Sequence, residues 1–254
     1  LVPIRGSLPR AISAAAWEEE AVLCVPAENL AEARVVPGLA SQGFASLRQF
    51  VFWTQGVSMG NSMPVERPEE PERTGAGEAS SIVGQHAAKR ALTVAAAGGH
   101  NAVLAGPPGS GKTLLARSLT ELLPPLEEEA ALLVTQVYSV AGLLEEGRLM
   151  RRPPFRQPHH TVTTAGLLGS KLPLKPGELT LAHAGVLFLD ELPEFGHATL
   201  ESLRQPMEDR HVTVSRVQGS VTFPASFMLV GAMNPCPCGH YGDALKECKC
   251  TLSE

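Results

Sequence analysis

Three short apolar runs, each followed by a polar residue or a glycine, set the pattern of the larger part of the chain. They are "NAVLAG", "GVLFLD" and "FMLVGAMN", and continuous apolar runs of this length indicate strands buried on both faces of a parallel sheet. Helical periodicity is seen in "HAAKRALTVAAAGGH", which ends in a glycine stop, and in "LLARSLTELL". This alternation of strands and helices predicts an α/β fold in which helices flank a parallel sheet.

The first 54 residues form a separate, smaller pattern. "AISAAAWEEEA" has a helical period, "VLCVPA" predicts a short strand, and "ENLAEARVV" predicts another helix. Residues 55–80 are rich in Gly, Pro, Ser and Glu and contain no aromatic residue, so they cannot bury enough apolar surface to fold alone. We therefore expect a small α/β piece at residues 1–54, a flexible linker at 55–80 and a larger α/β domain at 81–254.

Composition narrows the class of protein and its location. The chain of 254 residues is 44% apolar, and its net charge of −5 argues against a wholly basic nucleic-acid coat. The longest uncharged run, residues 92–111, contains glycines and prolines and is not expected to span a bilayer. Four of the five cysteines cluster at one end, unlike a secreted disulfide framework. We expect a cytoplasmic protein with no membrane partner.

The segment "GPPGSGKT" carries the most specific chemistry in the chain. It fits the pattern G-x-x-x-x-G-K-[ST] between a predicted strand and a predicted helix. Its glycines let backbone N–H groups turn toward phosphates, and the helix offers its positive end. Lys112 would reach the β- and γ-phosphates of ATP, and the Thr113 hydroxyl would ligate Mg²⁺. The residues expected to bind the nucleotide here are Gly106, Pro107, Pro108, Gly109, Ser110, Gly111, Lys112 and Thr113.

Polar residues at the ends of the other two runs complete the expected site. Asp190 and Glu191 follow "GVLFL", where a buried parallel strand presents its carboxyl end. Asp190 would help to bind the nucleotide by holding Mg²⁺ through water, and Glu191 would polarise the attacking water. Asn234 ends the third run, and its amide would bond the γ-phosphate or that water. We therefore predict a nucleotide triphosphatase with Lys112, Glu191 and Asn234 as catalytic residues.

These motifs together resemble the AAA+ ATPases, and within them the Mg-chelatase-like family typified by ComM and YifB. The similarity runs through "PFRQPHH", "PGELTLAHAGVLFLDELPEF", "LRQPMEDRHVTVSR" and "GAMNPCPCGHYGD" and covers nearly all of residues 80–254. It implies a P-loop AAA+ core in a homo-hexameric ring with ATP between subunits. By this resemblance, the phosphate loop binds the phosphates, and Asp190 and Glu191 serve the magnesium ion and the attacking water. Asn234 corresponds to the residue called the first sensor in AAA+ proteins.

Both ends of the chain depart from the family pattern. Residues 1–54 resemble the C-terminal part of a Lon-protease-like domain, but no lysine precedes Lys89, so a Ser-Lys dyad and proteolysis are not expected. No arginine follows Asn234, whereas AAA+ proteins place an arginine finger and a lid arginine after the first sensor. We expect a fragment of a longer ATPase that lacks the C-terminal lid and is inactive, or hydrolyses ATP very slowly, by itself.

The cysteine cluster leaves two interpretations open. Its spacing is C-x-C-x₉-C-x-C, and four thiolates are able to bind one structural Zn²⁺ tetrahedrally. Zinc sites favour C-x-x-C pairs, however, so the alternative is four reduced surface thiols. The candidate zinc ligands are Cys236, Cys238, Cys248 and Cys250.

Residues 147–177 form a basic segment without any acidic residue. Its positive residues are Arg148, Arg151, Arg152, Arg156, Lys171 and Lys175. One interpretation is a solvated face. The other follows from the resemblance, which places this insert at the ring pore, where it would contact DNA phosphates independently of base sequence. The adjacent His159 and His160 are expected to point apart and to make polar contacts within their loop.

A second element has a period of two. "RHVTVSRVQGSVTFPA" predicts a β-hairpin with Val212 and Val214 on one face and a turn at Gln218–Gly219. It is either an edge hairpin of the sheet or, by the resemblance, a second pore element that moves with nucleotide state.

The resemblance implies an ATP-driven motor that translocates DNA, a DNA helicase acting in branch migration during recombination. The alternative enzyme is the motor subunit of a magnesium chelatase, which inserts Mg²⁺ into a porphyrin, although chelatase motor subunits lack a Lon-like domain. A nucleotide-binding module without turnover is a third interpretation.

Overall fold

The computed structural model describes residues 1–15, 22–57, 82–144, 148–216, 219–241, 246–248 and 250–251. The chain divides into two compact units, the first comprising Leu1–Arg73 with Glu127–Arg151, the second Thr74–Leu126 with Arg152–Glu254. Most of the predicted linker, including residues 58–80, lies outside the described residues. The domain boundaries therefore stay a prediction, and the grouping of Glu127–Arg151 with the first unit is a feature that the sequence did not indicate.

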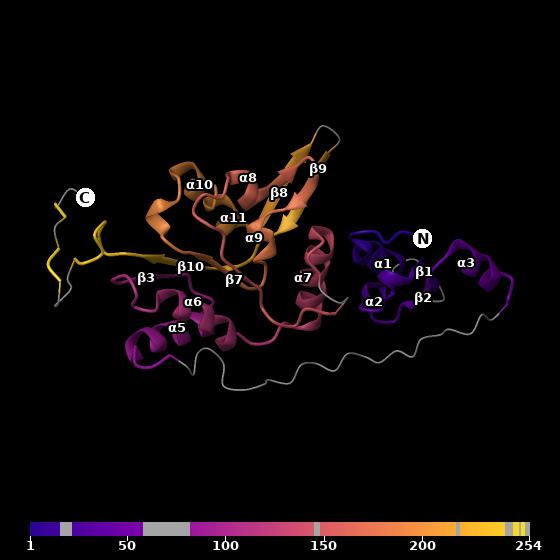
Figure 1. Ribbon diagram of the computed structural model, residues 1–254, viewed down its shortest axis with the longest axis horizontal. Coiled ribbons are helices and arrows are strands. Elements are labelled where there is room, and N and C mark those ends of the chain that lie inside the picture. Colours follow the sequence, from indigo (N-terminus) through magenta and orange to yellow (C-terminus); the bar gives the residue numbers. More distant parts are fainter. Residues whose placement is uncertain are drawn as a thin grey trace. The chain divides into compact units, whose positions relative to one another are not determined.

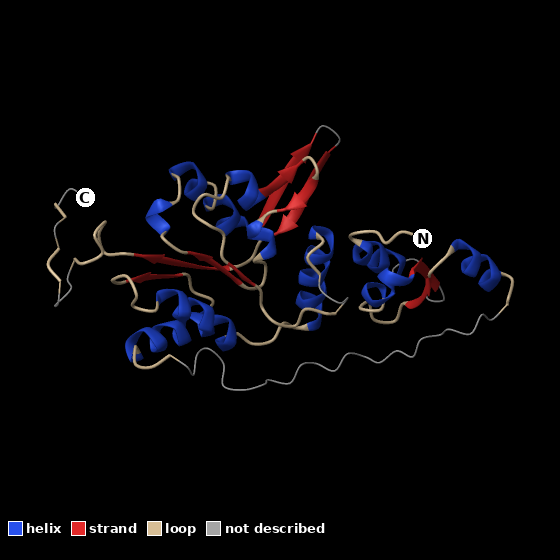
Figure 2. Ribbon diagram, in the orientation of Figure 1, coloured by secondary structure: helices blue, strands red, loops and turns tan. Residues whose placement is uncertain are grey.

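The described part of the second unit contains a four-stranded parallel sheet with the strand order β3-β10-β7-β4. Helices cover both faces of this sheet (Figure 2), which confirms the predicted α/β fold. The three predicted apolar runs form, in chain order, the strands β3, β7 and β10. Each strand begins and ends within a residue or two of the ends of its run. The strands are β3 (Ala102–Ala105), β4 (Phe155–Arg156), β7 (Val186–Leu189) and β10 (Met228–Met233).

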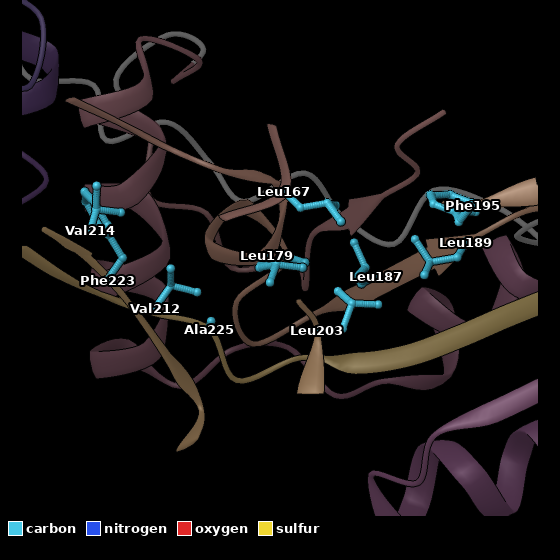
Figure 3. Packing of buried hydrophobic residues seen from close by; sticks show 11 residues of the cluster. Leu167, Leu179, Leu187, Leu189, Phe195, Leu203, Val212, Val214, Phe223 and Ala225 are labelled. Carbon is cyan, nitrogen blue, oxygen red and sulfur yellow. The ribbon is translucent and has the colours of Figure 1, made fainter. Parts of the chain in front are cut away.

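Alternate side chains of β7 pack into two separate cores on the two faces of the sheet. Val186 and Phe188 belong to a cluster with residues of α5 and α6. Leu187 and Leu189 belong to a cluster on the opposite face, shown in Figure 3. Since all four side chains are fully buried, the strand needs a continuous apolar run rather than an alternating one.

The helices of the second unit are arranged accordingly (Figure 1). Two long helices lie on one face of the sheet, and shorter ones lie on the other. The first pair is α5 (His86–Gly98) and α6 (Lys112–Leu122), and the second group is α8 (Thr164–Leu168), α9 (Glu178–Leu181), α10 (His197–Glu201) and α11 (Arg204–Asp209). A 3₁₀ turn, η2 (Leu192–Glu194), directly follows the acidic pair.

Two antiparallel hairpins accompany the sheet. β8 (His211–Arg216) pairs with β9 (Gly219–Pro224), which confirms the predicted hairpin, although Gln218 of its expected turn lies outside the described residues. Val212 and Val214 are both buried in the cluster of Figure 3. Among the described strands this pair forms its own sheet, so it is not an edge of the parallel sheet. β5 (Gly169–Lys171) and β6 (Leu174–Pro176) form a second pair within the basic segment.

The first unit contains a small parallel pair of strands, β1 and β2, with helices around it. The predicted strand is confirmed as β1, whereas β2 and α3 were not predicted. The elements are α1 (Ser7–Ala15), β1 (Val22–Pro26), η1 (Ala27–Asn29), α2 (Leu30–Ala33), β2 (Ala40–Phe44), α3 (Leu47–Thr54) and α7 (Glu128–Ala141). No described helix of either unit is long and apolar enough to cross a membrane.

The Glu32 carboxylate explains why α7 belongs to this unit. It accepts hydrogen bonds from the Leu8 N–H at 3.3 Å and from the hydroxyls of Ser7 and Ser139. Ser7 starts α1 and Ser139 lies on α7, and both are buried. Leu132 of α7 also packs against the core of this unit. A half-buried carboxylate with several donors joins elements that are more than a hundred residues apart.

Candidate functional site

The phosphate loop leaves β3 and runs directly into α6. Gly109 and Gly111 have φ angles of +75° and +84°, which residues with a Cβ rarely adopt. Gly111 is the N-cap of α6, an 11-residue helix that begins at Lys112. The backbone turns required by the sequence pattern are therefore present, and the loop lies at the positive end of a helix.

The Lys112 ammonium connects this loop to β10. Its Nζ donates to the Gly106 and Pro107 carbonyls at 2.8 and 3.0 Å and to Asn234 Oδ1 at 3.1 Å. Asn234 follows β10, and Met233 lies opposite Ala105 in the β3–β10 register. Strand pairing thus brings together two predicted site residues that are 122 positions apart.

The acidic pair lies at the end of β7, beside the start of α6. The Thr113 hydroxyl donates to Asp190 Oδ2 at 3.0 Å, and the Glu191 N–H donates to Asp190 Oδ1 at 3.0 Å. A hydroxyl oxygen and a carboxylate oxygen in contact are the hard ligands that Mg²⁺ takes in phosphate sites. Thr113 and Asp190 therefore fit the expected magnesium site.

Glu191 has a contact that the sequence did not indicate. Its Oε2 lies 3.0 Å from His160 Nδ1, and the His160 ring also meets the Phe195 ring edge to face at 6.5 Å between centroids. The rings of His159 and His160 are only 4.1 Å apart, so the expectation that they point apart is wrong. The chain is not extended there, because the Val162 N–H donates to the His159 carbonyl at 2.9 Å and closes a turn.

The polar contact expected within the loop is present for His159, whereas His160 makes its polar contact with Glu191, outside the loop. His159 Nδ1 lies 2.9 Å from the Thr161 hydroxyl, and His160 contacts Glu191 as described. The only sequence signal for the latter contact is the histidine pair in "QPHH", since nothing local connects it to an acid 31 positions later.

The four clustered cysteines bring their sulfur atoms within 4.8 Å of one another. Cys236 Sγ lies 3.4 Å from that of Cys238 and 3.7 Å from that of Cys248, and the last two are 3.6 Å apart. Zn–S bonds of about 2.3 Å in a tetrahedron give S···S distances of about 3.8 Å. The geometry is therefore compatible with one Zn²⁺, and the separations exceed the roughly 2.05 Å of a disulfide.

Backbone groups support the negative charge that metal binding requires. The N–H of Cys238 donates to Cys250 Sγ, and that of Tyr241 donates to Cys236 Sγ, each at 3.3 Å. The Cys238 N–H lowers the pKa of the Cys250 thiol, but the Cys238 thiol, burial and Cys236 raise it to about 12. Without a cation the sulfurs oppose one another's ionisation, whereas a bound metal ion compensates the charge of the thiolates.

One of the six cationic residues of the basic segment, Arg156, is paired with a carboxylate. Arg156 donates from Nε and Nη2 to the two oxygens of Glu178 at 2.7 and 2.9 Å, and the two side chains are only 28% and 22% exposed. Its charge is therefore compensated by the first residue of α9. Lys171 and Lys175 are exposed on the β5–β6 hairpin, and Arg151 and Arg152 are exposed as well.

A phosphate loop after β3 and an acidic pair after β7, with β10 between these two strands of one parallel sheet, define a P-loop protein of the AAA+ class. Residues 78–254 match the family model described as magnesium chelatase, subunit ChlI. Since this match covers more than half of the chain, the chain belongs to that family, in its Mg-chelatase-like branch with ComM and YifB.

Individual relatives agree with this assignment. An uncharacterized protein of Mycobacterium tuberculosis, Rv2897c, is 43% identical over 93% of this chain and 47% of its own length. YifB of Escherichia coli is 46% identical over 66% of this chain and 33% of its own, and the competence protein ComM of Haemophilus influenzae is 49% identical over 64% and 32%. The magnesium-chelatase 67 kDa subunit of Heliobacterium mobile is more distant, at 29% over 61% and 28%. The chain spans about half or less of the length of these curated relatives.

Proposed function

We propose that this chain is the nucleotide-binding part of an ATP-driven AAA+ motor that acts on DNA. The convergence of Lys112, Thr113, Asp190 and Asn234 at one edge of the sheet is the observation that carries the proposal. The relationship to ComM supports a role in handling DNA, since that relative is a competence protein. We further propose that the protein forms a homo-hexameric ring in the cytoplasm. The activity proposed for this ring is DNA translocation or branch migration.

Each residue has a proposed role. The Lys112 ammonium, which now bonds three oxygens, would bind the β- and γ-phosphates. Thr113 and Asp190 would hold Mg²⁺, which neutralises phosphate charge when bound. Glu191 would orient and polarise the attacking water. The Asn234 amide would donate to the γ-phosphate or to that water.

The magnesium chelatase alternative is not favoured. The relatives with that name are 29% and 31% identical to this chain, whereas YifB and ComM are 46% and 49% identical.

We also propose that Cys236, Cys238, Cys248 and Cys250 hold one structural Zn²⁺. The proximity of the four sulfurs supports this proposal. Metal analysis of protein purified without added zinc is expected to give about one equivalent. A content below about a tenth of an equivalent, with no uptake on reconstitution, would favour four reduced thiols.

The nucleotide proposal is tested by measuring the binding of a fluorescent ATP analogue with Mg²⁺. Lys112→Ala is expected to lower the affinity at least about a hundredfold, since it removes the charge nearest the expected phosphates. Lys175→Ala removes the same charge from an exposed hairpin position and is the matched control. Equal affinity in both variants contradicts the proposal.

A further inference from the structure

The cysteine cluster and the phosphate loop start from the same edge of the sheet. The Gly106 N–H donates to the Met233 carbonyl at 3.3 Å. The segments that follow β3 and β10 are therefore still paired where they leave the sheet. The phosphate loop begins at that point, and Asn234, which bonds Lys112, lies only two positions before Cys236. The first two cysteines are therefore placed next to the nucleotide site by the strand register.

A direct contact joins the two features. The Gly239 N–H donates to the Cys236 carbonyl at 2.9 Å and closes a turn that contains Cys238. Gly239 is buried and has a φ angle of +78°. A Cβ at Gly239 would lie 2.7 and 2.9 Å from Cδ and Cγ of Pro108. The backbone of the turn thus lies directly on the ring of a phosphate-loop residue.

The rest of the cysteine segment has little core of its own. Among its described residues, 235–241, 246–248 and 250–251, only Gly239 is buried. Such a segment gains its fixed conformation mainly from a cross-link or a bound metal, because too few apolar side chains are buried to offset its conformational entropy. Whatever holds the four sulfurs together therefore also holds the turn against Pro108.

We propose that a metal ion at the four cysteines fixes the phosphate loop through the Gly239–Pro108 contact, so that metal binding and nucleotide binding are thermodynamically coupled. This inference rests on the ATP and Zn²⁺ binding proposed above. Without the metal the turn is released, the phosphate loop must be ordered by the nucleotide itself, and the nucleotide affinity falls. The coupling is reciprocal, so bound nucleotide must raise the affinity for the metal by the same factor.

The first experiment measures nucleotide affinity in the zinc-loaded protein and after zinc is removed by a chelator under reducing conditions. The affinity for a fluorescent ATP analogue is expected to fall about tenfold or more and to recover when Zn²⁺ is added back. Circular dichroism shows whether the second unit stays folded after removal. Unchanged affinity in folded, zinc-free protein overturns the coupling.

A pair of glycine variants tests the contact while the four ligands stay intact. Gly239→Ala places a methyl group against Pro108 and is expected to lower nucleotide affinity about tenfold while zinc content stays near one equivalent. Gly38→Ala is the matched control, because Gly38 has a similar φ of +74° but no atom within 4 Å of its Cβ position. Equal nucleotide affinity in the two variants overturns the contact, even if zinc removal unfolds the protein.

The Lys112→Ala variant distinguishes a failure of the coupling from a failure of the proposed ATP binding or Zn²⁺ binding. It is expected to keep about one equivalent of zinc while losing the nucleotide. If the parent protein binds no nucleotide even when loaded with zinc, the proposed function fails, and the coupling fails with it. If nucleotide binds but no zinc is taken up, the metal proposal and the coupling fail while the ATP proposal stands.

Discussion

At the scale of single residues, Glu191 combines several constraints. It follows a fully buried strand, has a φ angle of +53°, and lies with its carboxylate against His160. A left-handed conformation in a residue with a side chain is costly and persists where the surrounding structure requires it. These features support its proposed role beside the phosphates, because they fix the direction in which the side chain leaves the sheet edge.

Glu191→Gln tests that role. The variant is expected to bind the ATP analogue within about twofold of the parent affinity, since Thr113 and Asp190 are unchanged. In a longer chain that includes the lid expected after Asn234, its rate of phosphate release is expected to fall at least about a hundredfold, because an amide cannot act as a base. Glu194→Gln makes the same chemical change in the adjacent 3₁₀ turn and should retain the parent rate. Equal rates in the two variants would contradict the assignment.

His183 gives the second unit a pH-dependent stability. Burial is the main cause that lowers the pKa of the His183 ring below its usual value. The Ser226 N–H donates to His183 Nδ1 at 3.1 Å, so the folded protein needs a neutral Nδ1. Because the folded pKa is below that of the unfolded chain, about 6.5, the unfolded state binds more protons in acid. Stability is therefore lost as the pH falls below about 6.5.

Denaturant unfolding at several pH values measures this effect. The free energy of unfolding should fall between about pH 7 and pH 5, and His183→Asn should show a weaker dependence. His211→Asn is the control, because it makes the same chemical change at an exposed position, where His211 Nδ1 donates to the Asp209 carbonyl at 2.8 Å. A pH dependence that is the same in parent and His183→Asn would remove this histidine as the cause.

At the scale of elements, the Arg156–Glu178 pair joins β4 to α9. Two hydrogen bonds in a partly buried setting are worth about 1–2 kcal/mol after allowance for solvent. Arg156→Met is expected to lower the free energy of unfolding by that amount. Arg204→Met is the matched control, since its pairs with Glu201 and Glu208 are 3.6 and 3.7 Å long and mostly exposed. Its effect should stay within about 0.5 kcal/mol, and similar losses in both variants would contradict the special role of Arg156.

The β5–β6 hairpin offers the clearest test of DNA contact within the basic segment. Lys171 and Lys175 are exposed on its two strands. If both contact phosphates, changing them to alanine should reduce the slope of log affinity against log salt by about 1.4 for single-stranded DNA. Nucleotide binding should not change, since neither lysine lies in a nucleotide motif.

The control for this measurement is the double change Arg48→Ala with Arg204→Ala, which removes the same charge at two exposed positions elsewhere. Binding with an unchanged salt slope in the hairpin variant would show that the hairpin is only a solvated surface. A slope that falls equally in both double variants would indicate a general effect of net charge.

At the scale of the whole molecule, the first unit includes a helix that lies within the family segment. The family match covers residues 78–254, whereas α7 packs with α1 and shares the Glu32 contacts. A chain that starts at residue 78 therefore lacks the partners of one face of α7. Amide hydrogen exchange in Glu128–Ala141 is expected to be at least about tenfold faster in that shortened chain, while α6 keeps its protection. Equal protection of α7 in both chains would contradict this packing.

Some elements were predicted better than others, for physical reasons. Strands β3, β7 and β10 and helices α5 and α6 were predicted because burial on both faces, periodicity and glycine stops are local signals. Leu200, Leu203 and Met207 have the spacing of one helix face, but the structure has two short helices there, and Met207 is 37% exposed. Periodicity did not reveal the break at Leu203, since both halves are helical.

The sequence by itself determined the chemistry of the candidate site, because that chemistry depends on residues close together in the chain. The glycines and Lys112–Thr113 of the phosphate loop, the Asp190–Glu191 pair and the C-x-C pairs are all readable from local spacing. Such motifs work through backbone turns and strand ends that a few residues specify. The alternation of apolar runs and helices likewise predicted the class of fold.

Only the tertiary structure decided which of these groups meet. The order β3-β10-β7-β4 places Asn234 beside Lys112 and Asp190 beside Thr113. The tertiary structure also places Gly239 against Pro108 and His160 against Glu191, and it pairs Arg156 with Glu178, so that Arg156 is not available to DNA. These contacts join residues that are 22 to 131 positions apart, and they follow from strand order, register and packing, which no local pattern of residue types specifies.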